Sequence, residues 1–271
     1  MKKIALLLSG LPRQWEPSLA TQLAMFGGHE IDVFFHFWDT IDALEKAAIL
    51  RLTKPKAYLF EAPQDFTLWD NDPAVRRDKI SVPSRVVSQF YSWNQTASLF
   101  APWLQDYDFA VRSRSDLQFV YSISHIFDQL KANDILVPWW VEKYLISDLF
   151  ALGDARAIFY YLTIYQRLRA YLPNCLFNPE LLLTHHFAHR ENLHIYTESF
   201  KYFFVRRPHM GGYTIEQCMN ENPGENKWLD PEVMGAHKNF FRSLSGEDGN
   251  RFVEDFAKLR IDQVDKQIRK T

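Results

Sequence analysis

The chain has few of the residues that build disulfide frameworks or zinc knuckles. Its 271 residues include two cysteines, Cys175 and Cys218, which lie far apart and form no Cys-x-x-Cys pair. This spacing indicates neither a disulfide scaffold nor a zinc knuckle. We therefore expect a reduced, cytoplasmic protein.

Long apolar runs and an excess of one charge are also missing. The N-terminal run at residues 4–8 is shorter than the core of a secretion signal, and no stretch approaches the roughly 18–20 apolar residues of a membrane span. The formal net charge of −2 argues against nucleic acid as the main partner. We expect no transmembrane segment, and peripheral association with the inner face of a membrane stays open.

Several catalytic motifs are absent as well. The chain contains no GxGxxG dinucleotide fingerprint, no GxxxxGK[ST] phosphate loop and no GxSxG nucleophile elbow. These absences weaken the case for dehydrogenases, P-loop enzymes and α/β-hydrolases. His185 and His189 are four residues apart on an expected helix, but no HExxH pattern accompanies them, so a packed helix is favoured over a zinc site.

Aromatic side chains, by contrast, are abundant at 15 % of the residues. A chain of this kind can bury enough area to offset its conformational entropy. Apolar and β-branched runs at 3–8, 31–38 and 57–61 predict strands, and helical spacing at 15–26 and 40–52 predicts helices between them. This order predicts parallel strands in an α/β sheet that helices cover on both faces.

No repeat or linker divides the chain, so we expect one domain over residues 1–271. Further helices are expected at 85–104, 155–171 and 179–189, and further strands at 109–112, 134–137, 148–152 and 200–206. Residues 62–82 are polar and interrupted by prolines, which predicts a loop. Beyond about residue 208 we expect an irregular part that ends in a helix over 250–268.

Charged residues gather where the apolar strand at 109–112 ends. Arg112, Arg114 and Asp116 would all point to one face if the alternation of the strand continues. Two cations and a carboxylate at a buried rim are costly unless they bind something. A diphosphate, with or without a divalent ion, would satisfy all three. An Arg–Asp ion pair that closes the end of the strand is the alternative, and the chemistry alone does not decide between them.

Five segments resemble bacterial and viral GT-A-like glycosyltransferases that act on surface polysaccharides, of the WavE lipopolysaccharide-synthesis kind. They are Ser9-Gly10-Leu11-Pro12-Arg13 after the first strand, the strand at 32–38, the helix at 84–93, the segment 107–117, and the segment 146–153 with Asn178-Pro179-Glu180 behind it. The resemblance covers about residues 3–190. It implies a GT-A-like (Rossmann-like), mostly parallel central sheet flanked by helices. Residues 1–120 would form mainly the nucleotide-binding half, and 121–271 mainly the acceptor half.

The resemblance also implies an activity. A hexosyl or deoxyhexosyl group would move from a nucleotide-diphosphate donor, with a UDP-sugar favoured, to a glycan acceptor in surface-polysaccharide or lipopolysaccharide synthesis. Arg114 stands where the first aspartate of a DxD motif is expected, so Asp116 is the carboxylate left to hold Mg²⁺ or Mn²⁺. Arginine can partly replace such a cation in neutralising the departing diphosphate, so the need for a metal stays open.

The expected site residues follow from these segments. The donor-binding candidates are Ser9, Gly10, Arg13, Gln89, Trp93, Arg112, Arg114 and Asp116. The candidates for the catalytic base are Asp148 first, then Glu180 and His186, with His36 and Asp39 behind them. Trp139 and Trp140 form the candidate acceptor platform. Structural roles compete with these: Asp148 would cap an element, Glu180 would be a first-turn helix acid, and the tryptophans would pack in the core.

Two other classes of protein stay open. A non-catalytic nucleotide- or carbohydrate-binding α/β protein with a degenerate site would account for the missing first aspartate of the DxD motif. A nucleotidyltransferase or a phosphatase on a similar sheet usually needs more clustered carboxylates than this sequence offers.

Overall fold

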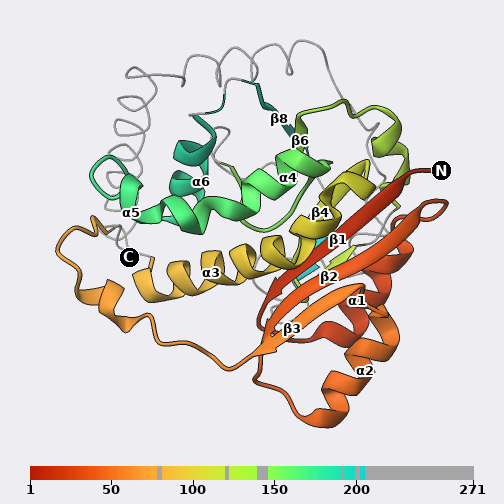
Figure 1. Cartoon of the computed structure of the whole chain (residues 1–271), viewed down its shortest axis with the longest axis horizontal. Helices are drawn as coiled ribbons and strands as arrows, with labels where there is room; N and C mark the ends of the chain where they lie inside the picture. The colour runs from red at the N-terminus through yellow and green to blue at the C-terminus, as the bar shows by residue number, and fades with distance from the viewer. Residues whose placement is uncertain are drawn as a thin grey trace, which may run out of the picture.

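A seven-stranded sheet forms the centre of the computed structural model, which describes residues 1–77, 81–119, 122–138, 146–188, 190, 192–198 and 202–204 (Figure 1). The strand order is β3-β2-β1-β4-β7-β6-β8. These strands are β1 (Lys3–Gly10), β2 (Glu30–Trp38), β3 (Ala57–Glu61), β4 (Phe109–Ser113), β6 (Asp134–Pro138), β7 (Ala151–Asp154) and β8 (His194–Glu198). A separate antiparallel pair consists of β5 (Leu117–Phe119) and β9 (Tyr202–Phe204).

The strand directions confirm the predicted α/β sheet. β1 pairs in parallel with β2 and β4, and β2 pairs in parallel with β3. β7 runs antiparallel to both of its neighbours, β4 and β6, whereas β6 and β8 are parallel. The sheet is therefore mixed but mostly parallel, and the carboxyl ends of β1, β2, β3 and β4 meet at one edge, where α/β proteins bind ligands.

Helices cover both faces of the sheet (Figure 1). One face carries α3 (Pro83–Phe100), α4 (Ala155–Leu162), α5 (Leu168–Tyr171) and α6 (Pro179–Ala188), and the other carries α1 (Trp15–Ala24) and α2 (Ala43–Thr53). Leu7 packs in one core with Phe90 of α3, while its neighbours Leu6 and Leu8 pack in the other core with Leu19 of α1. This alternation is what a strand buried on both faces requires.

Short 3₁₀ helices complete the described part of the chain: η1 (Thr67–Asn71), η2 (Ala101–Asp106), η3 (Ser124–Asp128) and η4 (Thr163–Arg167). One of them, η1, lies within the segment 62–82 that was predicted as a loop. Among the helices that the structure describes, none is both long and apolar enough to cross a bilayer.

Two predicted elements are wrong in their bounds. The strand expected at 148–152 begins later, at β7, because side chains instead of a neighbouring strand bind the preceding backbone: Tyr161 Oη donates to the Ser147 carbonyl at 2.6 Å, and Arg112 donates to the Asp148 carbonyl. The helix expected at 155–171 is interrupted after α4, where Thr163 Oγ1 donates back to the backbone carbonyl three residues earlier. The helix expected at 250–268 lies outside the described residues.

Candidate functional site

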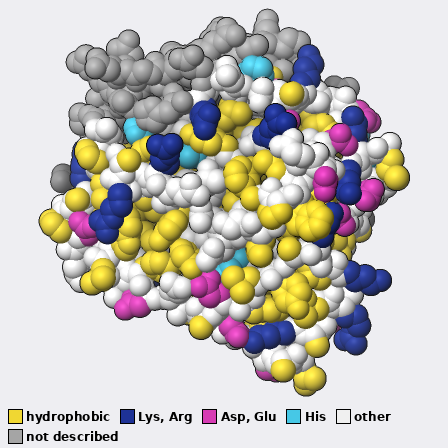
Figure 2. Space-filling view, viewed as in Figure 1, with side chains coloured by type: hydrophobic (Ala, Val, Ile, Leu, Met, Phe, Trp, Pro, Cys, Tyr) yellow, Lys and Arg dark blue, Asp and Glu magenta, His cyan; other side chains and the backbone are white. Residues whose placement is uncertain are grey.

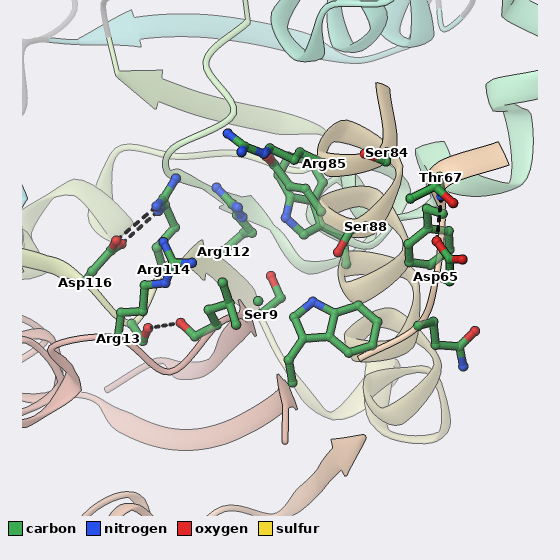
Figure 3. A pocket seen from close by; sticks show the side chains of 18 residues that line it. Ser9, Arg13, Asp65, Thr67, Ser84, Arg85, Ser88, Arg112, Arg114 and Asp116 are labelled. Atoms are coloured by element: carbon green, nitrogen blue, oxygen red, sulfur yellow. Dashed lines mark hydrogen bonds and ion pairs between the residues drawn. The ribbon is translucent and has the colours of Figure 1, made fainter. Parts of the chain in front are cut away.

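A pocket of about 700 Å³ opens at the sheet edge where β1, β2 and β4 end (Figure 3). Its walls come from the loop after β1, the end of β2, the segment after β3, the first half of α3, and the turn after β4. The volume lies within the range of about 300–1,000 Å³ that small-molecule sites occupy. All lining residues lie between Ser9 and Asp116, inside the part predicted to be mainly nucleotide-binding.

The structure brings together every residue predicted to bind the donor. Those that line the pocket are Ser9, Gly10, Arg13, Gln89, Trp93, Arg112, Arg114 and Asp116. They come from three separate segments of the chain, which meet because the parallel strands β1 and β4 end beside α3 at this edge. Their contact with a donor remains a prediction.

The loop after β1 turns sharply into the pocket. Gly10 has a φ of 107°, in the region that favours glycine, and the Arg13 amide donates to the Leu11 carbonyl at 2.8 Å. The Ser115 hydroxyl donates to the same carbonyl at 2.8 Å. The loop that carries Arg13 is therefore tied to the turn after β4, so that the two cationic segments are held together.

The turn after β4 is fixed from the opposite side by α1. β4 ends at Ser113, so the predicted strand alternation through Asp116 is wrong, although both Arg114 and Asp116 still line the pocket. Gln22 of α1 is buried, and its amide nitrogen donates to the carbonyls of Arg114 and Leu117 at 2.7 Å each. These two buried hydrogen bonds from the Gln22 amide nitrogen favour one conformation of the turn, while the Gln22 amide oxygen has no hydrogen-bond partner.

Arg112 is a buried cation to which no carboxylate of the described residues is ion-paired. It is 1 % exposed, its Nη1 donates to the Asp148 carbonyl, and its Nε has no hydrogen-bond partner. Its Cζ lies 4.1 Å from the centre of the Trp93 ring, which contributes a cation–π contact. Burial lowers the pKa of Arg112 to about 10; repulsion from Arg114 adds to this effect, and attraction to Asp148 and Asp116 opposes it.

At neutral pH the Arg112 guanidinium is therefore still charged, although its burial makes the charged form unfavourable. Burying an ion costs several kcal/mol unless a counter-ion and hydrogen bonds compensate. The unpartnered Nε of Arg112 and the unpartnered hydroxyl of Ser9 both belong to residues that line the pocket. An anion with several oxygen atoms would offer acceptors to both of these groups.

The other charged residues strengthen this electrostatic character. The charged lining residues are Arg13, Arg85, Arg112, Arg114, Asp65 and Asp116. Figure 3 shows the arginines after β1 and β4 on one side of the pocket, and Asp65 and Thr67 on the opposite side. Although the whole chain carries a net charge of −2, the pocket has more cations than anions, and one side of it is cationic.

A divalent cation, which the resemblance implies, does not fit the donor set of the described residues. Asp116 is buried, and its two carboxylate oxygens accept from Arg114 Nε and Nη2 at 2.8 and 3.0 Å. Within the described ranges, no three His, Cys, Asp or Glu side chains are placed to hold one ion. Mg²⁺ and Mn²⁺ need oxygen ligands that are free to coordinate.

An aromatic wall lines another part of the pocket and was missed by the sequence analysis. Trp38 and Phe66 line it, and Tyr91 of α3 stacks on Trp38 with ring centres 5.6 Å apart and planes inclined by 10°. The position of Trp38 at the carboxyl end of the second strand was the available signal. Phe66 belongs to a segment predicted as a loop, and no sequence pattern shows which way a loop folds.

Behind the aromatic wall lies a buried polar network around His36. Its Nε2 and Nδ1 lie 2.8 Å from Glu61 Oε2 and from Ser92 Oγ, and Tyr91 Oη donates to Glu61 Oε1 at 3.0 Å. Burial lowers the pKa of His36, and Glu61 only partly offsets that effect. Burial would raise the pKa of Glu61, but hydrogen bonds from His36, Tyr91 and Gln64 bring it below its ordinary value. A neutral His36 therefore donates to an ionised Glu61.

This network predicts a loss of stability in mild acid. Below about pH 6.5 the unfolded chain protonates its histidine while folded His36 stays neutral, so the free energy of unfolding should fall as the pH decreases from about 6.5 towards 5. Glu61 adds a further loss only when the pH falls below about 4.5. In His36→Gln the first decrease should be shallower, which urea unfolding at several pH values would measure. If the free energy of unfolding changed with pH equally steeply in His36→Gln and in the wild type, His36 would not be the source of this pH dependence.

The candidates for the base are spread over the structure. Asp148 is buried next to the pocket, where its Oδ2 accepts from Gln89 Nε2 at 2.7 Å. Glu180 lies in the first turn of α6 and does not line the pocket. His186 is buried between helices, with Nδ1 2.7 Å from Tyr171 Oη and its ring stacked 4.1 Å from that of Tyr160.

The remaining candidates lie elsewhere. His36 is fully buried behind the aromatic wall, and exposed Asp39 pairs with Lys46 at 2.5 Å. Trp139 and Trp140, the candidate acceptor platform, lie outside the described residues, directly after the carboxyl end of β6. No family model matches the chain, and no curated protein matches its sequence. The fold and the site by themselves define an α/β protein with a cationic pocket at the carboxyl edge of its sheet.

Proposed function

We propose that the chain is a GT-A-type glycosyltransferase that takes a sugar from a nucleotide-diphosphate donor, with a UDP-sugar favoured. The observation that carries the proposal is the buried guanidinium of Arg112, which has no ion pair among the described residues and whose Nε has no hydrogen-bond partner, at the wall of a 700 Å³ pocket on the carboxyl edge of the sheet. A diphosphate supplies the missing counter-charge and accepts from several guanidinium N–H groups at once.

The two sides of the pocket suit the two ends of a nucleotide. The diphosphate would lie against Arg13, Arg112 and Arg114, which occupy one side of the pocket in Figure 3. The base would lie against Trp38 or Phe66, since planar rings stack on aromatic side chains. The ring of Trp93, one of the donor-binding candidates, lies against Arg112, so we assign it to the support of that cation.

The chemistry then follows from these positions. The bond between sugar C1 and the diphosphate oxygen breaks, and its electron pair leaves with the diphosphate. The guanidinium groups stabilise this departing charge, which preorganised cations do well in a site that excludes water. A new bond forms from an acceptor hydroxyl to C1, and its proton passes to a base. Asp148 is our choice for this base, because two hydrogen bonds hold it next to the pocket. Its carboxylate accepts from Gln89 and its backbone carbonyl accepts from Arg112, and both of these residues line the pocket.

The acceptor assignment rests on the sequence resemblance alone. We propose a glycan acceptor in surface-polysaccharide or lipopolysaccharide synthesis, at the cytoplasmic side of the membrane. A nucleic-acid partner is not favoured, because the chain carries a formal net charge of −2; on the one face seen in Figure 2 the Lys and Arg side chains are interspersed with Asp and Glu. An electrostatic footprint for nucleic acid would gather the cations in one patch.

Asp148→Asn tests the catalytic part of the proposal. The variant should bind UDP with nearly the wild-type affinity, because the Asn oxygen can still accept from Gln89. It should lose sugar transfer by about 100-fold or more, because an amide cannot take the proton. Isothermal titration gives the affinity, and release of UDP from a panel of UDP-sugars, with water or a glycan as acceptor, gives the activity.

The results of these assays distinguish a glycosyltransferase from a non-catalytic nucleotide-binding protein. An equal loss of binding and transfer in Asp148→Asn would make Asp148 a binding residue and not the base. Nucleotide binding by the wild type with neither donor hydrolysis nor transfer would instead favour a non-catalytic nucleotide-binding protein. A screen of UDP, GDP, CMP and dTDP by thermal shift would identify the base that the aromatic wall accepts.

A further inference from the structure

Divalent cations assist diphosphate chemistry by bridging phosphate oxygens and carrying two positive charges next to them. A protein that uses such an ion needs carboxylates that are available as ligands. The carboxylates that line this pocket are Asp65 and Asp116. Each carboxylate accepts hydrogen bonds from another residue of the chain, and neither set of bonds positions the carboxylate to coordinate a metal ion.

Asp116 is engaged by a cation of the chain itself. It is 3 % exposed, and its two oxygens receive the paired N–H groups of Arg114 at 2.8 and 3.0 Å. This fork is the geometry in which a carboxylate and a guanidinium bind most specifically. Asp65 is exposed in the segment after β3, where its Oδ1 accepts from the Thr67 amide at 2.8 Å. It lies on the side of the pocket opposite to Arg114 in Figure 3.

The positive charge that a metal would bring is already present. Arg112 is buried without an ion pair, and Arg114 is close enough to lower its pKa by repulsion. Asp116 offsets the charge of Arg114, but the second guanidinium, that of Arg112, has no ion pair among the described residues, so a further anion beside the two groups would be stabilised. Exposed Arg13 and Arg85 line the same pocket. A diphosphate in this position would therefore meet cations on the protein itself.

We propose that the pocket binds the diphosphate of its nucleotide without a divalent cation, and that Asp116 positions Arg114 instead of ligating a metal. This inference rests on the proposed function, because it concerns the same nucleotide. It assigns the charge-neutralising role to Arg112 and Arg114 and makes Asp116 a positioning residue.

Titration of UDP into the full chain, once in excess EDTA and once in Mn²⁺, tests the inference. The two affinities should agree within about twofold, which is about 0.4 kcal/mol. Binding that is tighter in Mn²⁺ by about tenfold or more would overturn the inference and leave the proposed function intact. Absence of UDP binding in both conditions would overturn the proposed function and this inference with it.

Asp116 variants test the positioning role. In EDTA, Asp116→Ala should weaken UDP binding by about fivefold, because Arg114 must then lose side-chain freedom on binding. Asp116→Asn should restore part of that loss, because its amide oxygen still accepts from Arg114. Electron paramagnetic resonance of Mn²⁺ added alone should show no stoichiometric site. A stoichiometric Mn²⁺ site that disappears in Asp116→Asn, or a loss of UDP affinity confined to Mn²⁺ buffers, would overturn the assignment.

Discussion

Arg112→Met should strongly weaken nucleotide-diphosphate binding without lowering the stability of the ligand-free protein. UDP affinity should fall by about 30-fold or more, about 2 kcal/mol, which is the lower end of what removal of one partner from a buried charge pair costs. The reason is that Arg112 is the buried cation of the pocket and lacks a counter-ion in the described part of the chain. Isothermal titration of UDP measures the loss.

The melting temperature of ligand-free Arg112→Met distinguishes a binding residue from a residue that the fold needs. Removal of the charge relieves a desolvation penalty of several kcal/mol. Against this stand about 1.5 kcal/mol, the lower end for a hydrogen bond from a charged group, for the bond to the Asp148 carbonyl and about 2 kcal/mol for the contact with Trp93. The melting temperature of the ligand-free variant should therefore equal or exceed that of the wild type. A clear decrease would show that Arg112 holds the fold together.

A matched control is available on the other side of the sheet. Arg51 lies exposed in the last turn of α2 and does not line the pocket. Arg51→Met removes the same charge from the chain but should leave the UDP affinity unchanged. If both variants lost binding to the same extent, the effect would come from overall charge and not from the pocket.

Gly153→Ala should cost more stability than an alanine at Gly27, another glycine in the described part of the chain. Gly153 lies in β7, between Ala110 of β4 and Ile135 of β6. A Cβ at this position would lie 2.1 Å from the Asp134 carbonyl oxygen and 2.9 Å from the Ile135 Cα, both of which are backbone atoms that cannot rotate away. Two strands would have to separate to admit the methyl group.

The expected cost is about 3 kcal/mol, the upper end for overpacking, which corresponds to a decrease in melting temperature of roughly 6–12 °C. Thermal unfolding followed by circular dichroism measures it. Gly27→Ala is the control, because the nearest atom to its added Cβ is 3.8 Å away, and it should shift the melting temperature little. Similar melting temperatures for the two variants would show that β7 does not pack as closely as described.

Much of the fold could be predicted from the sequence, because the apolar pattern of each segment agrees with the element that the segment forms in the sheet. The strand over Ala57–Glu61 and the parallel order of the first three strands follow from short apolar and aromatic runs separated by helical segments. The bounds of β7 could not be predicted, because the Arg112 and Tyr161 side chains occupy the backbone acceptors just before it. Such long-range bonds leave no periodic signal in the sequence.

Part of the candidate site could likewise be predicted from the sequence, and part could not. The cations after β4 stood out because charge at the end of a buried strand is unusual, and the structure gathers all eight predicted donor residues at one pocket. Trp38, Phe66 and Arg85 were missed, since an aromatic or basic residue at the end of an element has many other uses. Their part in the pocket depends on how the segment after β3 and the start of α3 approach the strand ends.

The central claim is that the cationic side of the pocket binds the diphosphate of a nucleotide. The most direct test is a titration of uridine, UMP and UDP into the wild-type protein in EDTA. The affinity should rise at each step, with UDP bound about 100-fold or more tightly than uridine, because charged hydrogen bonds to buried guanidinium groups contribute about 1.5–3 kcal/mol each. Equal affinities for uridine and UDP, or no binding of UDP, would contradict the account.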